Sequence, residues 1–122
     1  MGKIQILIAD DHPIIRAGLK QIISETNDMT IADEAGNGQE VLNLVRKKKY
    51  DLLLLDISMP GRNGLEILKE LKSEYPKLPV LILSIYPEEQ YAVRAFRAGA
   101  SGYLTKESAA NELISAIYKI VK

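Results

Sequence analysis

Five polar side chains of this 122-residue sequence lie at or just after the ends of short apolar runs. They are three carboxylates, a hydroxyl and an amine: Asp10, Asp11, Asp56, Ser84 and Lys106. Crowded carboxylates repel one another, so they need cations nearby or a shared proton. Lys106 supplies one positive charge, and the rest suits Mg²⁺, a hard cation that binds oxygen ligands and commonly bridges to a phosphoryl oxygen. The set predicts phosphoryl transfer, in which a protein mainly positions groups and neutralises charge around an aspartate nucleophile.

This chemistry requires the residues to meet, and the apolar pattern predicts the elements that would bring them together. Short β-type runs alternate with helix-period segments five times along the chain. The expected strands are Ile4–Ala9, Met29–Asp33, Leu52–Leu55, Val80–Leu83 and Gly102–Leu104. Three of them are nearly continuous apolar runs, which is typical of parallel strands covered by helices on both faces. The fold class is therefore α/β, with a five-stranded parallel sheet flanked by five helices.

In a flavodoxin-like, doubly wound sheet of order 2-1-3-4-5, ligands bind outside the carboxyl ends of the strands, near the point where the order reverses. The second strand is then an edge strand, so its acidic residues should lie away from the crevice. Taken singly, Asp11 could be only a helix N-cap, Asp56 a loop residue and Lys106 a solvated charge. Their arrival at one edge from different strands favours a functional site.

Helical spacing of apolar residues separates the strands. The main positions are Ile14, Ile15, Leu19, Ile22, Ile23, Val41, Leu42, Leu44, Val45, Leu65, Leu68, Leu71, Leu113, Ile117, Ile120 and Val121. Asn37 and Asn63 each precede a glutamate by three residues, the spacing of a capping box, and Pro13 fits the first turn of a helix. The helix expected at 88–98 is apolar around too much of its surface for one stripe, which favours a wide core contact over a partner surface.

Three further features have a structural interpretation. His12 is expected to be an exposed residue at the start of a helix, without a chemical role. The lysines at 47–49 lie near a helix end, where cations suit the helix dipole. The Gly-Asn-Gly segment at 36–38 is too weak a signal for dinucleotide binding, because Val41 stands where a third glycine would be and nearby carboxylates would repel a pyrophosphate.

Composition narrows the class of protein. Sixteen Lys and Arg balance sixteen Asp and Glu, so no overall basic field favours nucleic acid or anionic lipid. The lack of cysteine excludes disulfides, Cys-ligated metal sites and thiol catalysis. The apolar runs are far shorter than a spanning helix, which predicts a cytoplasmic protein without a membrane partner. The length fits one domain, residues 1–122.

Family-type motifs cover nearly the whole chain. They are Asp10-Asp11, Asp56-Ile57-Ser58-Met59-Pro60-Gly61-Arg62-Asn63-Gly64, Leu83-Ser84 and Gly99-Ala100-Ser101-Gly102-Tyr103-Leu104-Thr105-Lys106. With these motifs the chain resembles the receiver domain of bacterial two-component response regulators. The segments 9–13 and 97–104 resemble the NarL/FixJ-type subgroup, whose receivers usually precede a helix-turn-helix domain of the LuxR type.

The resemblance implies a metal-dependent phosphoacceptor. Asp56 matches the aspartate that takes a phosphoryl group from a phosphohistidine of a sensor histidine kinase. Asp11 matches a direct ligand of Mg²⁺ (or Mn²⁺), and Asp10 matches a carboxylate that acts largely through a metal-bound water. Ser58 matches the residue whose backbone carbonyl binds the metal, and Asp56 completes this ligand set.

The resemblance also implies a switch. Lys106 matches the lysine that pairs with the phosphate, Ser84 the hydroxyl that bonds the phosphoryl oxygens, and Tyr103 the aromatic whose rotation reports phosphorylation. A phosphoryl adds roughly −1.5 to −2 charges, which would draw Ser84 and Lys106 inward. Ile85 stands where the family commonly has a small residue, so we expect it to crowd Tyr103 and bias that ring outward. Tyr86 is expected to screen the phosphoryl from water.

The implied output is control of transcription through a helix-turn-helix domain absent from this chain, with homodimers forming on phosphorylation and DNA bound only by that domain. A free-standing receiver and a phosphorylation-independent receiver-like module are alternatives, and the filled site positions count against the second. An aspartate-nucleophile phosphatase of the haloacid dehalogenase type fits worse. Ser58 stands where that family has a second aspartate, and the chain is too short for a cap domain.

Overall fold

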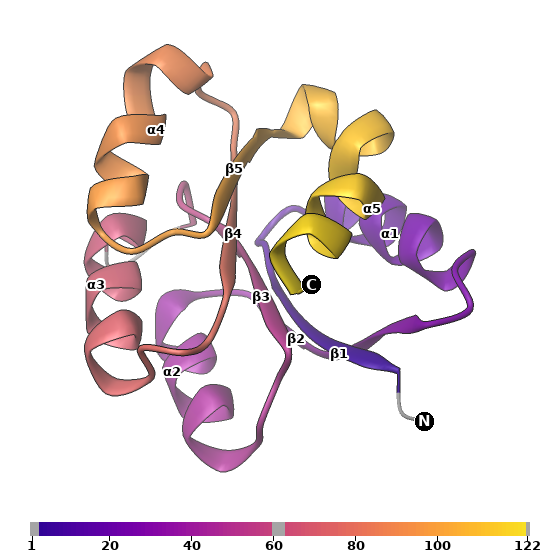
Figure 1. Cartoon of the computed structure of the whole chain (residues 1–122), viewed down its shortest axis with the longest axis horizontal. Helices are drawn as coiled ribbons and strands as arrows, with labels where there is room; N and C mark the ends of the chain where they lie inside the picture. The colour runs from indigo at the N-terminus through magenta and orange to yellow at the C-terminus, as the bar shows by residue number, and fades with distance from the viewer. Residues whose placement is uncertain (1–2, 60–62, 122) are drawn as a thin grey trace.

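Strands and helices alternate along the chain in the computed structural model, which describes residues 3–59 and 63–121 (Figure 1). The strands are β1 (Ile4–Ala9), β2 (Met29–Ala35), β3 (Leu52–Asp56), β4 (Val80–Ser84) and β5 (Gly102–Thr105). The helices are α1 (Pro13–Ser24), α2 (Gly38–Lys47), α3 (Gly64–Glu74), α4 (Glu88–Arg97) and α5 (Lys106–Val121). Within those ranges, no helix has the length and apolar character needed to cross a bilayer.

All strand pairs are parallel, and the order in the sheet is β2-β1-β3-β4-β5. The predicted α/β fold and strand order are therefore confirmed. Because β1 pairs with both β2 and β3, the order reverses at β1, and the carboxyl ends of β1, β3, β4 and β5 lie next to one another. Asp56 is in register with Leu83, and Ser84 is in register with Thr105.

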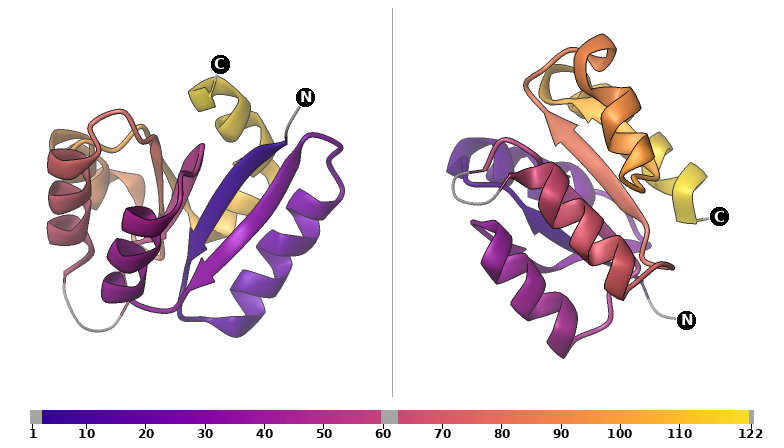
Figure 2. Two further views of the ribbon diagram at one scale, coloured as in Figure 1. Left: turned by 90° about the horizontal axis from the view of Figure 1, so that it is seen from below. Right: turned by 90° about the vertical axis from the view of Figure 1, so that its left-hand side faces the viewer.

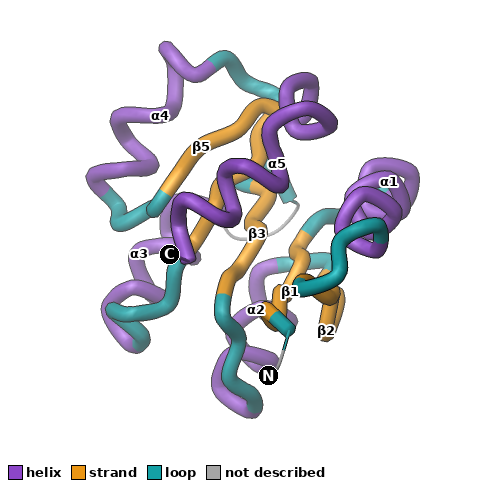
Figure 3. The backbone as a smooth tube through the Cα atoms, turned by 45° about the vertical axis from the view of Figure 1, so that its right-hand side comes forward, coloured by secondary structure: helices purple, strands orange, loops and turns teal. Residues whose placement is uncertain are grey.

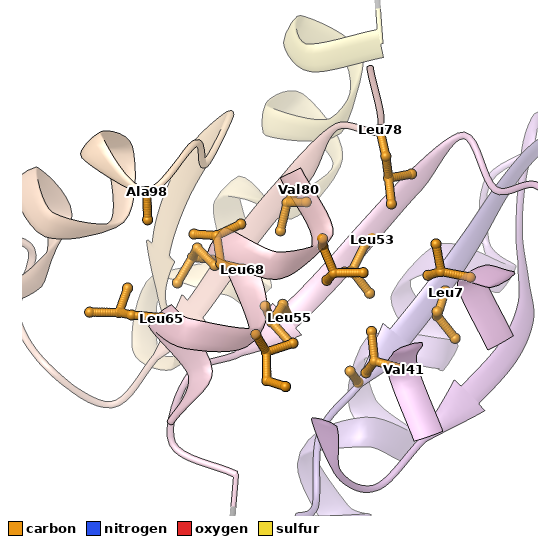
Figure 4. Packing of buried hydrophobic residues seen from close by; sticks show 14 of the residues in the cluster. Leu7, Val41, Leu53, Leu55, Leu65, Leu68, Leu78, Val80 and Ala98 are labelled. Carbon is orange, nitrogen blue, oxygen red and sulfur yellow. The ribbon is translucent and has the colours of Figure 1, made fainter. Parts of the chain in front are cut away.

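Alternate residues of the central strands serve two separate cores, because successive side chains of a strand point to opposite faces. Leu53 and Leu55 pack with residues of α2, α3 and α4 on one face (Figure 4). Leu52 and Leu54 pack with α1 and α5 on the other face. The two helix layers are visible on either side of the sheet in Figure 2, and Figure 3 shows α1 and α5 together on their side.

The predicted helix starts are present, with one difference in detail. At α2, the Asn37 side chain accepts a hydrogen bond from the Glu40 N–H at 2.9 Å and donates to the Glu40 carboxylate at 3.1 Å. At α3, Asn63 accepts from the Leu65 N–H at 2.8 Å, one residue before the expected partner. Pro13 begins α1 as expected. These caps satisfy amide donors that a helix start leaves free.

Two expectations about buried faces are wrong. Ile14 was assigned to the apolar stripe of α1, but it is 87% exposed, and the buried positions of this helix are Leu19 and Ile23. The wide core contact expected for α4 is also absent, because Val93 and Phe96 are 60% and 48% exposed. Helix α4 instead packs on the sheet through small alanines, which bring it close and leave its larger apolar residues outside.

The acidic residues of the edge strand β2 have ion-pair partners outside the acidic cluster. Asp33 accepts hydrogen bonds from Lys48 Nζ at 2.7 Å and from the Tyr50 hydroxyl at 2.6 Å. Glu34 pairs with Arg16 and Lys20 of α1. Lys48, which was interpreted as part of a solvated run, thus ties the end of α2 to the sheet edge.

Candidate functional site

The predicted site residues come together at the carboxyl edge of the sheet. Asp10 follows β1, Asp56 and Ser84 end β3 and β4, and Lys106 begins α5 directly after β5. The Thr105 hydroxyl accepts a hydrogen bond from the Ser108 N–H at 3.2 Å, which caps the first turn of α5 beside Lys106. Strand order thus explains why residues far apart in the sequence become neighbours.

Lys106 is the cation of the site. Its Nζ donates to Asp56 Oδ2 at 2.8 Å and lies 3.2 Å from Asp10 Oδ2. The side chains of Asp10 and Asp56 are fully buried, and that of Lys106 is 7% exposed. Buried carboxylates are tolerable only with cations and hydrogen-bond donors close by. The three side chains therefore form one electrostatic unit.

Asp56 has donors on both carboxylate oxygens. Its Oδ1 accepts from the Ser58 N–H at 2.9 Å and from the Ser58 hydroxyl at 2.6 Å, while its Oδ2 accepts from Lys106. The role of the Ser58 backbone carbonyl as a metal ligand stays a prediction. The hydrogen bond from the Ser58 hydroxyl is not predicted by the sequence motifs, although a serine two residues after a buried aspartate is a common local hydrogen-bond partner.

Two buried carboxylate oxygens of the site lack hydrogen bonds. Asp10 Oδ2 and Asp11 Oδ1 are buried atoms without a hydrogen-bond donor. Lys106 Nζ is 3.2 Å from the first and His12 Nδ1 is 3.2 Å from the second, distances typical of ion pairs but without hydrogen-bond geometry. Buried oxygens usually have partners, so a divalent cation fits this donor set.

His12 lies in the same cluster, although the sequence predicts only an exposed residue at a helix start. It precedes α1 and its side chain is 51% exposed, as expected for a residue at a helix start. Its Nδ1, however, is 3.1 Å from Asp10 Oδ1 and 2.9 Å from Lys106 Nζ. The signal was the position of His12 directly after two site aspartates.

Ser84 and Tyr103 meet at the start of the β4–α4 loop. The Ser84 hydroxyl oxygen accepts from the Tyr86 N–H at 2.9 Å, and the Tyr103 hydroxyl donates to the Tyr86 carbonyl at 3.0 Å. Tyr103 is buried, and this burial raises the pKa of its hydroxyl. The expected crowding is wrong, because Ile85 is 61% exposed and leaves Tyr103 inside. Screening of a phosphoryl by Tyr86 stays a prediction.

The motif that begins at Asp56 includes Pro60, Gly61 and Arg62, which lie outside the described residues. A family model described as the response regulator receiver domain matches residues 6–118. This chain belongs to that receiver family. The match includes residues of all five strands of the sheet and the acidic residues at its carboxyl edge.

Individual receivers and regulators support the assignment. NarL, the nitrate/nitrite response regulator of Escherichia coli K12, is 40% identical over 114 residues, which cover 93% of this chain and 53% of NarL. The transcriptional regulatory protein YxjL of Bacillus subtilis is 39% identical over 115 residues, covering 94% and 53%. A solved LuxR-family response regulator from Aurantimonas has 32% identity and a TM-score of 0.92, covering 98% of this chain and 86% of that one.

The resemblance to NarL-type receivers is therefore confirmed. The chain spans about half the length of these curated relatives. It corresponds to the receiver part of a two-component response regulator.

Proposed function

We propose that residues 1–122 form one receiver domain whose Asp56 accepts a phosphoryl group from the phosphohistidine of a sensor histidine kinase. The observation that carries this proposal is the buried Asp56 carboxylate held between Lys106 and Ser58, beside two carboxylate oxygens that lack donors. In the reaction an Asp56 oxygen bonds to phosphorus as the P–N bond breaks, and the imidazole leaves with the electron pair. The product is an acyl phosphate on Asp56.

The residues of this chain would position and neutralise the transferred group. Lys106 already contacts Asp56 Oδ2, so it is close enough to pair with a phosphoryl oxygen on that carboxylate. The Ser58 hydroxyl fixes the other oxygen, which orients the nucleophile. Phosphoryl transfer asks mainly for such positioning and for charge neutralisation.

A divalent cation, Mg²⁺ or Mn²⁺, would complete the charge balance. Asp10, Asp11, Asp56 and the backbone carbonyl of Ser58 are the residues that would hold it, and the buried oxygens of Asp10 and Asp11 lack hydrogen bonds as such ligands would. When bound, the ion neutralises charge on the phosphoryl oxygens. The donors are carboxylates, which suit these hard ions.

Phosphorylation would act on the surface through Ser84 and Tyr103. A phosphoryl on Asp56 would accept a hydrogen bond from the Ser84 hydroxyl, whose oxygen accepts from the Tyr86 amide, so a movement of Ser84 towards the phosphoryl would also move Tyr86. The Tyr103 hydroxyl donates to the carbonyl of the same Tyr86. A shift of residues 84–86 would therefore change which position of the Tyr103 ring is favoured. This coupling supports a two-state surface, as phosphorylation switches require.

The proposed partners follow from the relatives. A cytoplasmic sensor kinase domain would supply the phosphoryl group, and two phosphorylated copies would form a homodimer. YxjL is a transcriptional regulatory protein, and both NarL and YxjL are about twice as long as the matched segment. We propose that the output is transcription, with DNA bound by a helix-turn-helix domain outside the segment matched here.

The test is incubation of the chain with acetyl phosphate and Mg²⁺, followed over time by intact-mass spectrometry. We expect a phosphoryl adduct on the parent chain and none on Asp56→Asn. Rapid release of phosphate without an adduct would favour a phosphatase of the haloacid dehalogenase type. No reaction would favour the phosphorylation-independent module.

A further inference from the structure

The acidic cluster contains one nitrogen ligand among its oxygens. His12 Nδ1 is 3.1 Å from Asp10 Oδ1, 3.2 Å from Asp11 Oδ1 and 3.7 Å from Asp56 Oδ2. These four residues offer one ligand atom each, and all four atoms lie within 4.8 Å of one another. Tetrahedral zinc sites have metal–ligand distances of about 2 Å, which corresponds to ligand atoms roughly 3.3 Å apart. The His12 separations are close to that spacing.

The backbone holds His12 at this position. The His12 N–H donates to Asp10 Oδ1 at 2.7 Å. The His12 carbonyl accepts a hydrogen bond from the Arg16 N–H, in the first turn of α1, at 2.9 Å. The Arg16 guanidinium also donates to the Asp10 carbonyl at 2.9 Å. The ring is therefore placed by the same short segment that carries Asp10 and Asp11, so it needs no rearrangement of the fold to reach a bound ion.

Independent evidence for a ligand comes from the buried oxygens. Asp10 is fully buried, and its Oδ2 has no hydrogen bond, although Lys106 Nζ lies 3.2 Å from it. Three carboxylates outweigh the single ammonium of Lys106, so the cluster has charge for a divalent ion. Lys106 Nζ lies 2.9 Å from His12 Nδ1, so the imidazole nitrogen faces the ammonium of the cluster, and an ion bound by His12 would replace this contact.

The identity of the donor atoms sets the metal preference. Carboxylate and carbonyl oxygens suit Mg²⁺ and Mn²⁺, whereas an imidazole nitrogen suits Zn²⁺ and its neighbours among the transition metals. We propose that His12 acts as a fourth ligand, so that the acidic site of this chain binds Zn²⁺ in competition with Mg²⁺. The inference rests on the acidic cluster being the metal site of the proposed function. Because the two ions would share Asp10, Asp11 and Asp56, bound Zn²⁺ would exclude Mg²⁺ from the phosphoacceptor site.

The chain contains a single histidine, which makes the test direct. Imidazole proton resonances in an NMR spectrum come from His12 alone, and Zn²⁺ is diamagnetic, so its binding shifts them without broadening from unpaired electrons. We expect Zn²⁺ to shift these resonances and Mg²⁺ to displace it. We also expect His12→Gln to weaken Zn²⁺ binding by roughly 10-fold or more while changing Mg²⁺ affinity by no more than about 2-fold. Calorimetric titration of both variants measures this difference.

A second variant separates a four-ligand site from zinc held by an exposed imidazole. In Asp11→Asn the Zn²⁺-dependent shift of the His12 resonances should need a much higher zinc concentration. Unchanged resonances in the parent chain, equal zinc affinity in His12→Gln, or an unaltered shift in Asp11→Asn would each overturn the inference. Phosphorylation of Asp56 in zinc-free buffer with Mg²⁺ reports on the proposed function separately, so failure of one is distinguishable from failure of the other.

Discussion

Lys106 pairs with two buried carboxylates at once, and at the scale of single residues we expect this contact to matter for both stability and the proposed chemistry. Asp10 and Asp56 have no exposure to water, and Lys106 has little. Sequence reasoning identified these residues because each lies at the end of a strand. It did not identify the contact between His12 and Lys106, because those residues are 94 positions apart and meet only through the order of the strands.

Removal of the Lys106 charge should lower the stability of the fold, whereas removal of the Asp56 charge should not. Lys106→Met leaves buried carboxylates without their cation, so we expect the free energy of unfolding to fall by about 3 kcal/mol. Asp56→Asn removes one of three crowded carboxylates and is isosteric, so its stability should be equal to that of the parent or higher. Urea unfolding at neutral pH measures both. A destabilised Asp56→Asn beside an unaffected Lys106→Met would contradict this account of the charges.

At the scale of elements, the strands and helices were largely predictable from the sequence, but the exact ends of the strands and the buried faces of the helices were not. Four strands continue one or two residues beyond the expected ends: β3, β4 and β5 extend through the polar Asp56, Ser84 and Thr105, and β2 extends to Ala35. Ile14 fitted the helical spacing of α1, but a helix buries only one face, and Leu19 and Ile23 occupy it. Spacing alone does not say which apolar residues at the margin of a stripe stay outside.

Two glycines in helices should respond oppositely to alanine. A Cβ on Gly64, the first residue of α3, would lie 2.5 Å from the Ile57 Cα, so backbone must move, and we expect a loss of about 1–3 kcal/mol. Gly18 in α1 has nothing within 4 Å of such a Cβ, so Gly18→Ala should stabilise by about 1 kcal/mol. Thermal unfolding followed by circular dichroism compares the pair. Similar melting temperatures for both variants would refute the close approach of the β3–α3 loop to α3.

The stabilisation from the Asp33–Lys48 contact, which joins β2 to the end of α2, should depend on pH. Hydrogen bonds from Lys48 and then from Tyr50 lower the pKa of Asp33. A carboxyl group with a lowered folded-state pKa stabilises the fold above its ordinary value of about 4 and loses this contribution as pH falls through the lowered value. Asp33→Asn should therefore be less stable than the parent at about pH 7, with the gap closing towards about pH 3. Urea unfolding of both proteins across this pH range measures the difference. A difference in the free energy of unfolding that does not change with pH would contradict the prediction.

At the scale of the whole molecule, one parallel sheet with a helix layer on each face brings four strand ends next to one another, and the proposed switch and metal ligands share that edge. This arrangement was predictable because alternating apolar runs and polar strand ends are both written in the sequence. The inward position of Tyr103 was not, because it depends on where the backbone of Tyr86 passes. Side-chain placement across a loop is a tertiary property.

The central claim is that Asp56 alone becomes phosphorylated, and chemical trapping tests it most directly. Borohydride reduces an aspartyl acyl phosphate to homoserine, so peptide mapping by mass spectrometry after treatment with acetyl phosphate and Mg²⁺ locates the modified residue. We expect homoserine at position 56, dependent on Mg²⁺ and absent when the phosphodonor is omitted. Homoserine at Asp10 or Asp11, or no conversion in a chain that has been shown to be folded, would contradict the assignment of Asp56 as the phosphoacceptor.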